Sequence, residues 1–330
     1  MEKANETGSF YALGPEQVLQ AIESVGFDCD GSQFALNSYE NRVYQVGVVD
    51  GEPVIAKFYR PLRWTDEAII EEHQFTLDLA DLEIPVVPPD SIEGNTLFEH
   101  HGHRFALYPK RGGRAPDLEN HEHLKQLGRF LGRIHALGAS EDFSYRPELS
   151  IEHFGEDSYN YLLNEGFIPL ELERVYEPLA EDLLDRVDAL LERAGDFHTI
   201  RLHGDCHPGN ILWTDDGPHI VDFDDARTGP AIQDLWMFLT GERAHMESGL
   251  AALLEGYTRF HDFNSRELNL VEALRTLRMM HYAAWLARRW DDPAFKMAFP
   301  WFNTQNYWEE HILSLKEQAA LMDEPPLQWS

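Results

Sequence analysis

Cysteine is almost absent from this sequence. Its 330 residues include only two, Cys29 and Cys206. Two thiols are too few for a disulfide framework or a thiolate zinc site, so the count fits a protein of a reducing compartment. Any metal ion is therefore expected to be held by oxygen ligands.

Long apolar runs are also absent. No stretch of about 18 apolar residues occurs, the length that a membrane-spanning helix needs. The opening residues, MEKANETGSF, carry acids and polar side chains where a secretory signal needs a basic start and an apolar stretch. With 43% apolar residues, the chain can still bury a substantial core. We therefore expect a cytoplasmic protein that binds no membrane. We also expect a monomer.

Basic residues are scarce as well. Lysine and arginine number 27 against 58 acids, which gives a formal net charge of −31. Such a charge repels the phosphates of nucleic acids and of anionic membranes, so we expect no nucleic-acid partner. The charge either attracts a cationic partner or serves solubility alone.

The first third of the chain predicts a small sheet with two helices. Asp50 and Gly51 separate two β-rich runs, which is a strong hairpin signal. Thr65 precedes two acids, as expected at the start of a helix. The predicted elements are a helix over 15–25, strands over 42–49 and 53–59, a helix from 65 to 79, and a second hairpin, TLFEH with HRFALYP, about Gly102.

The rest of the chain predicts mainly helices. Leu124, Leu127, Leu131 and Ile134 recur at spacings of three and four, as on one face of an amphipathic helix. Further helices are expected over 172–194, 230–240, 247–260, 266–290 and 305–322. No repeat or long flexible linker occurs, so we expect coupled lobes: an N-terminal lobe over 1–109, a hinge over 110–116, and a C-terminal lobe over 117–330.

Polar residues follow two apolar segments near the middle of the chain. IRLHGDCHPGNILW contains Asp205 and Asn210, and HIVDFDDA, after a turn at 215–217, contains Asp222. Strand-like segments of this kind deliver their polar residues into loops, where active sites tend to lie. We expect a hairpin to bring the three side chains together.

These residue types suit phosphoryl transfer. That reaction needs a group that orients the attacking hydroxyl, oxygen ligands for magnesium, and a cation on the nucleotide phosphates. Asp205 suits the first role, and Asn210 and Asp222 suit the second. The alternative is that these residues only form turns. The compound spacing, five residues and then twelve, favours catalysis.

HGDCHPGN with VDFDDA resembles the catalytic signature of the aminoglycoside-phosphotransferase-like kinases, a branch of the protein-kinase-like fold that includes choline and homoserine kinases. Within that branch the chain is more similar to the stress response kinase A family of bacterial serine/threonine protein kinases. That likeness is carried by LNSYENRVYQ, VIAKFYRPLRWT, EEHQF, LHGDCHPGNILW, GPAIQDLWM, WLARRW, DPAF and EPPLQ. It implies an α+β, two-lobed fold, with a small antiparallel-sheet N-lobe that clamps the nucleotide and a larger, mainly helical C-lobe. It also implies that Asp205 is the catalytic aspartate, that Asn210 and Asp222 bind Mg²⁺, and that ATP is the phosphate donor.

The resemblance implies that Lys57 contacts the phosphates of ATP and that Glu72 is its partner. A lysine inside the apolar run VIAKFY is costly to bury unless it is paired. The alternative is a strand lysine that extends its charge to solvent. Glu71 is adjacent to Glu72 and is the second candidate for the pairing.

A glycine-rich phosphate loop is missing before Lys57. The corresponding stretch, LNSYENRVY, offers Ser38, Asn41 and Arg42 instead, so we expect Ser38 and Asn41 to contribute to nucleotide binding. An ordinary polar turn is the alternative. In the family that this chain resembles, the serine that matches Ser38 looks like a site of autophosphorylation. Asp224 stands where the wider kinase pattern has a glycine, which puts control by an activation loop in doubt.

Two residues in or near the signature, Asp234 and His207, complete the predicted site, and Cys206 lies beside His207 in the sequence. By resemblance, Asp234 should brace the catalytic loop through hydrogen bonds; the alternative is a solvated acid in the first turn of a helix. His207 positions Asp205, contacts phosphate, or is structural. Cys206 is expected to be a buried, inert thiol rather than a redox-sensitive one.

Two groups of histidines suggest a metal site, but their spacing argues against it. His100, His101 and His103 surround a hairpin glycine and alternate between faces, whereas His121 and His123 point away from each other on a helix. We therefore expect no histidine-bound metal.

The leading hypothesis is an ATP- and magnesium-dependent serine/threonine protein kinase in a bacterial stress response, with itself as one substrate. The first alternative is a small-molecule kinase that acts on an aminoglycoside, a choline-like compound or an amino alcohol. The second alternative is a pseudokinase that acts as a binding module; intact Lys57, Asp205, Asn210 and Asp222 argue against it.

Overall fold

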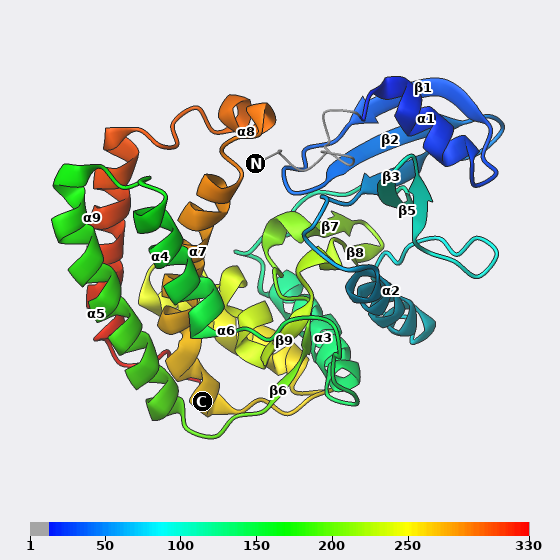
Figure 1. The fold of residues 1–330 in the computed structure, drawn as a ribbon. Coiled ribbons are helices and arrows are strands. Elements are labelled where there is room, and N and C mark those ends of the chain that lie inside the picture. Colours follow the sequence, from blue (N-terminus) through cyan, green and yellow to red (C-terminus); the bar gives the residue numbers. More distant parts are fainter. Residues whose placement is uncertain (1–12, 330) are drawn as a thin grey trace. The chain divides into compact units, whose positions relative to one another are not determined.

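The structure is a computed structural model that describes residues 13–329. These residues form two compact units, whose elements are coloured along the chain in Figure 1. The first unit consists of the described residues up to Asp117, Phe143–Arg146 and His207–Ala226, and the second of Leu118–Asp142, Pro147–Cys206 and the described residues from Arg227 onward. The chain thus changes units between Cys206 and His207, inside the segment that carries Asp205 and Asn210.

The first unit is built on an antiparallel sheet, as predicted. Its strands lie in the order β1 (Cys29–Ala35), β2 (Arg42–Val48), β3 (Val54–Phe58), β5 (His103–Pro109) and β4 (Phe98–His100). Two helices accompany it, α1 (Pro15–Glu23) and α2 (Asp66–Asp81). The Oγ1 atom of Thr65 accepts the N–H of Ala68 at 3.2 Å and caps α2, as the sequence indicates.

Strand β1 is not among the predicted elements. It pairs only with β2 and lies at the edge of the sheet. Its sequence, CDGSQFA, has no fully buried position, so it lacks the alternation of apolar and polar residues that identifies a strand. The core of this unit lies elsewhere, among apolar side chains of α1, β2, β3 and β5: Val18, Ile22, Val46, Ala56, Phe58, Phe105 and Leu107.

A second, two-stranded sheet belongs to the first unit although it comes much later in the chain. It consists of β7 (Ile211–Thr214) and β8 (Gly217–Ile220). The N–H of Ile220 donates to the carbonyl of Pro85 at 2.8 Å, and the N–H of Val87 donates to the carbonyl of Ile220 at 3.0 Å. Backbone hydrogen bonds therefore attach this hairpin to the segment after α2.

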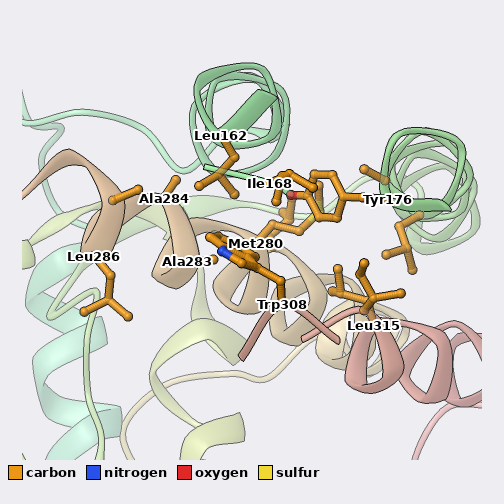
Figure 2. Close-up of a cluster of buried hydrophobic side chains, with 14 of the residues drawn as sticks. Leu162, Ile168, Tyr176, Met280, Ala283, Ala284, Leu286, Trp308 and Leu315 are labelled. Carbon is orange, nitrogen blue, oxygen red and sulfur yellow. The ribbon is translucent and has the colours of Figure 1, made fainter. Parts of the chain in front are cut away.

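The second unit is mainly helical, which confirms the predicted fold class. It contains α3 (His121–Gly138), α4 (Asp157–Asn164), α5 (Leu170–Ala194), α6 (Arg243–Tyr257), α7 (Val271–Arg288), α8 (Pro293–Ala298) and α9 (Gln305–Met322), together with β6 (Thr199–Leu202) paired with β9 (Arg227–Pro230). Figure 2 shows its core, where Met280 and Ala284 of α7 lie among Leu162 of α4, Tyr176 of α5 and Trp308 of α9. Within residues 13–329, no helix is long and apolar enough to cross a membrane.

The predicted helix over 230–240 is wrong. After β9 the chain forms two 3-10 turns, Ala231–Asp234 and Trp236–Phe238. The N–H of Ile232 donates to Oε2 of Glu267 at 3.0 Å, so a tertiary partner satisfies this backbone group. The spacing of apolar residues over 230–240 gives no information about such a tertiary partner.

Other boundaries differ as well. The predicted helix over 266–290 begins as the 3-10 turn Ser265–Leu270 and continues as α7. The short helices α4 and α8 and the π-helical turn Glu152–Glu156 are not among the predicted elements, because segments of this length carry little periodicity.

Candidate active site

Lys57 is a buried cation in the first unit. It lies on β3, between β2 and β5, and its residue is 6% exposed. Its Nζ atom lies 2.9 Å from Oδ1 of Asp222 and 3.2 Å from Oδ1 of Asp224. Burial alone would lower the pKa of Lys57, but the two aspartates raise it well above its ordinary value. The lysine is therefore charged at neutral pH.

The pairing of Lys57 with Glu72 that the resemblance implies is not the pairing in this structure. Glu72, on α2, is 2% exposed. Its negative charge helps to raise the pKa of Lys57, but its carboxylate forms neither of the two ion pairs given above. Burial raises the pKa of Glu72 to about 7, although Lys57 lowers it. Asp222 and Asp224 offer closer oxygens, which explains the different partner.

Glu71 has a separate task. Its carboxylate accepts the backbone N–H groups of Ser144, Tyr145 and Arg146 at 2.6 to 2.9 Å. It therefore holds residues 143–146 against α2, and Glu72 is the one of the two that faces Lys57.

Asn210 and Asp222 flank the same end of the β7–β8 hairpin. Ile211 pairs with Ile220, and the N–H of Val221 donates to the carbonyl of Asn210 at 3.0 Å. Asp222 has φ +63°, a left-handed conformation that is costly for a residue with a side chain and that clusters at functional sites. The tertiary fold thus brings these two predicted ligands together.

The donor chemistry of Asn210 and Asp222 fits magnesium. The Asp222 side chain is 53% exposed, so its oxygens are accessible. Magnesium is commonly held by one or two protein oxygens and completes its shell with substrate phosphates and water. The described residues contain no self-sufficient cluster of three or more His, Cys, Asp or Glu side chains suited to a metal ion. Asn210 and Asp222 offer oxygen atoms of the kind that Mg²⁺ takes alongside substrate phosphates.

Arg63 connects this centre to the loop that stands in place of a glycine-rich loop, and sequence reasoning missed it. Its guanidinium pairs with Asp224 and lies 2.8 Å from Asp225. On its other side, its Nε atom lies 3.8 Å from Glu40, next to Tyr39 in the Ser38 loop. Burial alone would raise the pKa of Asp224, but Arg63 and Lys57 hold it below its ordinary range. No local sequence pattern indicated this contact, because Asp224 and Asp225 lie more than 160 positions from Arg63.

Three further residues of the predicted site, Asn41, Ser38 and His207, also belong to the first unit. Asn41 is buried, and its Oδ1 accepts the N–H of Arg60 at 3.0 Å, so this oxygen is committed to the protein. Ser38 is half-buried in the loop between β1 and β2. The Nδ1 atom of His207 accepts the N–H of Gly209 at 3.0 Å. None of these contacts tests a role in nucleotide binding.

The second unit holds Asp205 on a loop that Asp234 braces. The carboxylate of Asp234 accepts the N–H of His203 at 2.8 Å and that of Gly204 at 2.9 Å. A third contact, at 3.1 Å, joins it to Nε2 of His135. Burial alone would raise the pKa of Asp234, but these hydrogen bonds and the nearby histidines hold it below its ordinary range. The hydrogen bonding expected from the resemblance is therefore present.

Two groups behind Asp234 were not predicted. The Oη atom of Tyr257 shares a hydrogen bond of 2.8 Å with Nδ1 of His135, and Nε2 of Gln233 donates to the carbonyl of Gly204 at 3.0 Å. Both act on the loop from sequence-distant elements, so no local pattern could have indicated them. Cys206 is fully buried beside the loop, and burial raises its thiol pKa, which makes it inert.

Asp205 itself is paired with an arginine that sequence reasoning also did not single out. Nη1 of Arg278, on α7, donates to Oδ1 of Asp205 at 2.5 Å. The Asp205 side chain is 26% exposed and that of Arg278 is 42% exposed, so both remain accessible.

Comparison with known proteins identifies the family of the chain. A family model described as the phosphotransferase enzyme family matches residues 32–271. Stress response kinase A of Escherichia coli O157:H7 is 42% identical over 324 residues, which cover 98% of each protein. A protein named serine/threonine protein kinase RdoA of Salmonella typhimurium (strain LT2) is 41% identical over 320 residues, 97% of each.

Among solved structures, amicoumacin kinase hAmiN, in complex with AMP-PNP, Ca²⁺ and Ami, is similar with a TM-score of 0.71. The two chains are 18% identical, and the match covers 95% of each. At this identity the likeness shows the fold alone, which is that of the protein-kinase-like phosphotransferases.

Proposed function

The chain belongs to the phosphotransferase enzyme family, and from this premise we propose that it is an ATP- and magnesium-dependent serine/threonine protein kinase of a bacterial stress response, acting as a monomer in the cytoplasm. The observation that carries the choice of a protein acceptor is the similarity, at 41–42% identity over nearly the full length, to proteins named stress response kinase A and serine/threonine protein kinase. Kinase activity follows from the family; the acceptor, the metal and the physiological role are the proposal.

The proposed reaction transfers the γ-phosphoryl group of ATP to a serine or threonine hydroxyl. The hydroxyl oxygen forms a bond to the γ-phosphorus as the bond to the bridging oxygen breaks, and ADP leaves. Asp205 orients the hydroxyl and accepts its proton. The loop on which it stands is held by Asp234, which limits the positional freedom of the carboxylate.

The first unit supplies the groups for the nucleotide in this proposal. Asn210 and Asp222 provide oxygens for Mg²⁺, which when bound neutralises phosphate charge. Lys57, released from Asp222, contacts the phosphates, and Glu72 lies near it as a buried carboxyl group. Ser38 and Asn41 provide further contacts in place of a glycine-rich loop, and Ser38 is the proposed site of autophosphorylation.

A small-molecule acceptor is the alternative. The amicoumacin kinase structure named above has the same fold and is named as a kinase of a small molecule. Because the two chains are only 18% identical, this likeness does not indicate the acceptor of the present chain. The two possibilities differ in where the labelled phosphate ends.

The test incubates the purified chain with labelled ATP and magnesium, alone, with a mixture of proteins, and with an aminoglycoside or an amino alcohol. We expect label on protein, including the chain itself, and none without magnesium. Label found only on the small acceptor refutes the proposed function.

Variants then test the assigned residues. Asp205→Ala and Asp222→Ala should each reduce the transfer rate by about 10³-fold or more. Lys57→Met should chiefly weaken binding of Mg-ATP, and Ser38→Ala should remove label from the chain while transfer to other proteins continues. Asp188→Asn, an exposed position of α5, is the matched control and should keep full activity. Unchanged turnover in Asp222→Ala would contradict its role in metal binding.

A further inference from the structure

The ion pair between Asp205 and Arg278 has a consequence for the acceptor. The hydroxyl that receives the phosphate must come within hydrogen-bond reach of the Asp205 carboxylate. Arg278 donates to Oδ1 of that same carboxylate. An acceptor whose hydroxyl reaches this carboxylate therefore comes near a guanidinium, whose charge is permanent.

The position of Arg278 is fixed by its helix. The opposite face of α7 is buried in the core of the second unit, through Leu277. Met280 and Ala284, which Figure 2 shows, belong to the same buried face. Arg278 stands on the face that this core does not cover, with 42% of its side chain exposed. The arginine is thus presented to an approaching acceptor by a rigid element, and it does not depend on a mobile loop.

Other basic side chains contact aromatic rings near α7 in the second unit. His281 follows Arg278 by one helical turn, and its ring lies 4.5 Å from that of Phe154. The guanidinium of Arg227 lies 4.7 Å from the centre of the same Phe154 ring. Further along the helix, Arg288 lies over the ring of Tyr161 at 5.0 Å.

The sequence of this segment is exceptional within its chain. Residues 273–290 include four arginines and no acid, although 58 of the 330 residues are acids. Residues 273–290 therefore carry a local excess of positive charge in an acidic chain, and Arg278 is the residue of this segment that pairs with the proposed catalytic aspartate. A role in solubility does not explain a local excess of the opposite sign.

We propose that Arg278 makes the site select acceptors with acidic groups near the reacting hydroxyl and reject acceptors with amines there. This inference rests on the proposed role of Asp205. An ammonium group adjacent to the hydroxyl, as in an aminoglycoside or an amino alcohol, is repelled by Arg278, whereas a neighbouring glutamate, aspartate or phosphorylated residue is attracted. The substrate class is thus an acidic serine or threonine segment of a protein.

The positions of the arginines along α7 also determine how far from the acceptor residue an acid in the substrate can lie and still be recognised. Arg288 and Arg289 come ten and eleven residues after Arg278, a distance of about 15 Å along a helix. An extended peptide covers that distance in about four or five residues. Acids next to the acceptor residue should therefore depend on Arg278, and acids four or five residues away should depend on Arg288 and Arg289.

The experiment measures a ratio. Two serine peptides of equal length, one flanked by glutamates and one by lysines, are compared as acceptors for the full chain with Mg-ATP. We expect kcat/KM to favour the acidic peptide by about tenfold or more. Arg278→Gln should bring the ratio close to one, and Arg278→Glu should invert it. Arg193→Gln, which removes an exposed arginine from α5, is the matched control and should leave the ratio unchanged.

A ratio separates selection from a merely structural role, because a distorted Asp205 would slow both peptides equally. A ratio that stays the same in both Arg278 variants, or that favours the lysine peptide in the unmodified chain, overturns the inference.

The affinities of the same peptides with serine replaced by alanine provide a readout that needs no catalysis. If the chain transfers no phosphate to protein, the proposed function fails, and these affinities still decide the inference. Loss of the acidic preference in Arg278→Gln supports it. Equal affinities for the acidic and basic peptides in the unmodified chain refute it.

Discussion

Asp234 holds the loop of Asp205 by accepting two backbone N–H groups, those of His203 and Gly204. In Asp234→Asn the side chain has a single acceptor oxygen for these donors, so one of them loses its partner. We expect kcat to fall by about 100-fold with little change in KM for ATP, because a small displacement of the catalytic carboxylate slows the chemical step. The free energy of unfolding should fall by about 1–3 kcal/mol.

Steady-state kinetics and urea unfolding check this prediction, with Asp188→Asn as the exposed control. A fall in kcat that is matched by an equal rise in KM for ATP would argue against a role confined to the Asp205 loop.

Glu267 predicts a dependence of stability on pH. It is 4% exposed, and burial raises its pKa to about 7, although hydrogen bonds from the N–H groups of Ile232 and Ala231 lower it. Below about pH 4.5 the group is protonated in the folded and the unfolded chain alike. Between that value and about 7 it is protonated only in the folded chain, so its contribution to stability falls as the pH rises.

Unfolding free energies measured from pH 5 to pH 8 should therefore decline less in Glu267→Gln than in the unmodified chain, by at most about 3 kcal/mol over the range. Glu272→Gln, at a half-buried position of the neighbouring helix, serves as control. Parallel pH profiles for the unmodified chain and Glu267→Gln would show that Glu267 is ionised throughout.

At the scale of elements, α3 and α6 pack closely because glycines line their contact. A Cβ atom on Gly128 of α3 would overlap the carbonyl oxygen of Leu253, and one on Gly256 of α6 would overlap that of Lys125. Backbone atoms cannot move aside as side chains do, so the helices would have to separate.

We expect Gly128→Ala to lower the free energy of unfolding by about 2–4 kcal/mol in urea titrations, despite the better helix propensity of alanine. Gly249→Ala is the matched control on α6, since its added Cβ would lie 3.4 Å from Leu124, an ordinary contact. It should be neutral or slightly stabilising. Equal effects of the two substitutions would show that the helices adjust freely.

At the scale of the whole molecule, the net charge of −31 acts against folding. Salt screens repulsion among exposed acids, since the Debye length falls to about 3 Å at 1 M, whereas buried pairs such as Lys57 with Asp222 are screened less. We expect the melting temperature to rise by several degrees between about 0.02 and 0.5 M NaCl.

Replacing the exposed acids Asp185, Asp188 and Glu192 of α5 by their amides should make this dependence shallower. A melting temperature that falls with salt would mean that ion pairs outweigh the general repulsion.

The sequence by itself determined the elements with long periodic patterns and the chemistry of the signature. Helix α9 lies at the predicted residues, and the turn at Asp50 joins β2 and β3 as expected, with Asp50 at φ +56°. Asp205, Asn210 and Asp222 were selected because their residue types and spacing suit phosphoryl transfer, whereas the roles of Lys57 and Asp234 came from the resemblance to a known family. Patterns of this kind are local, so they can be read along the chain.

Only the tertiary structure decided which distant residues meet. It assigned the β7–β8 hairpin to the first unit, exchanged Glu72 for Asp222 and Asp224 as partners of Lys57, and replaced a predicted helix after β9 by two 3-10 turns. It also placed Arg63 beside Asp224 and Arg278 beside Asp205. These contacts join residues from 73 to more than 160 positions apart. Burial and charge in the folded chain decide which of these distant residues pair with each other. A pattern read along the sequence does not contain that information.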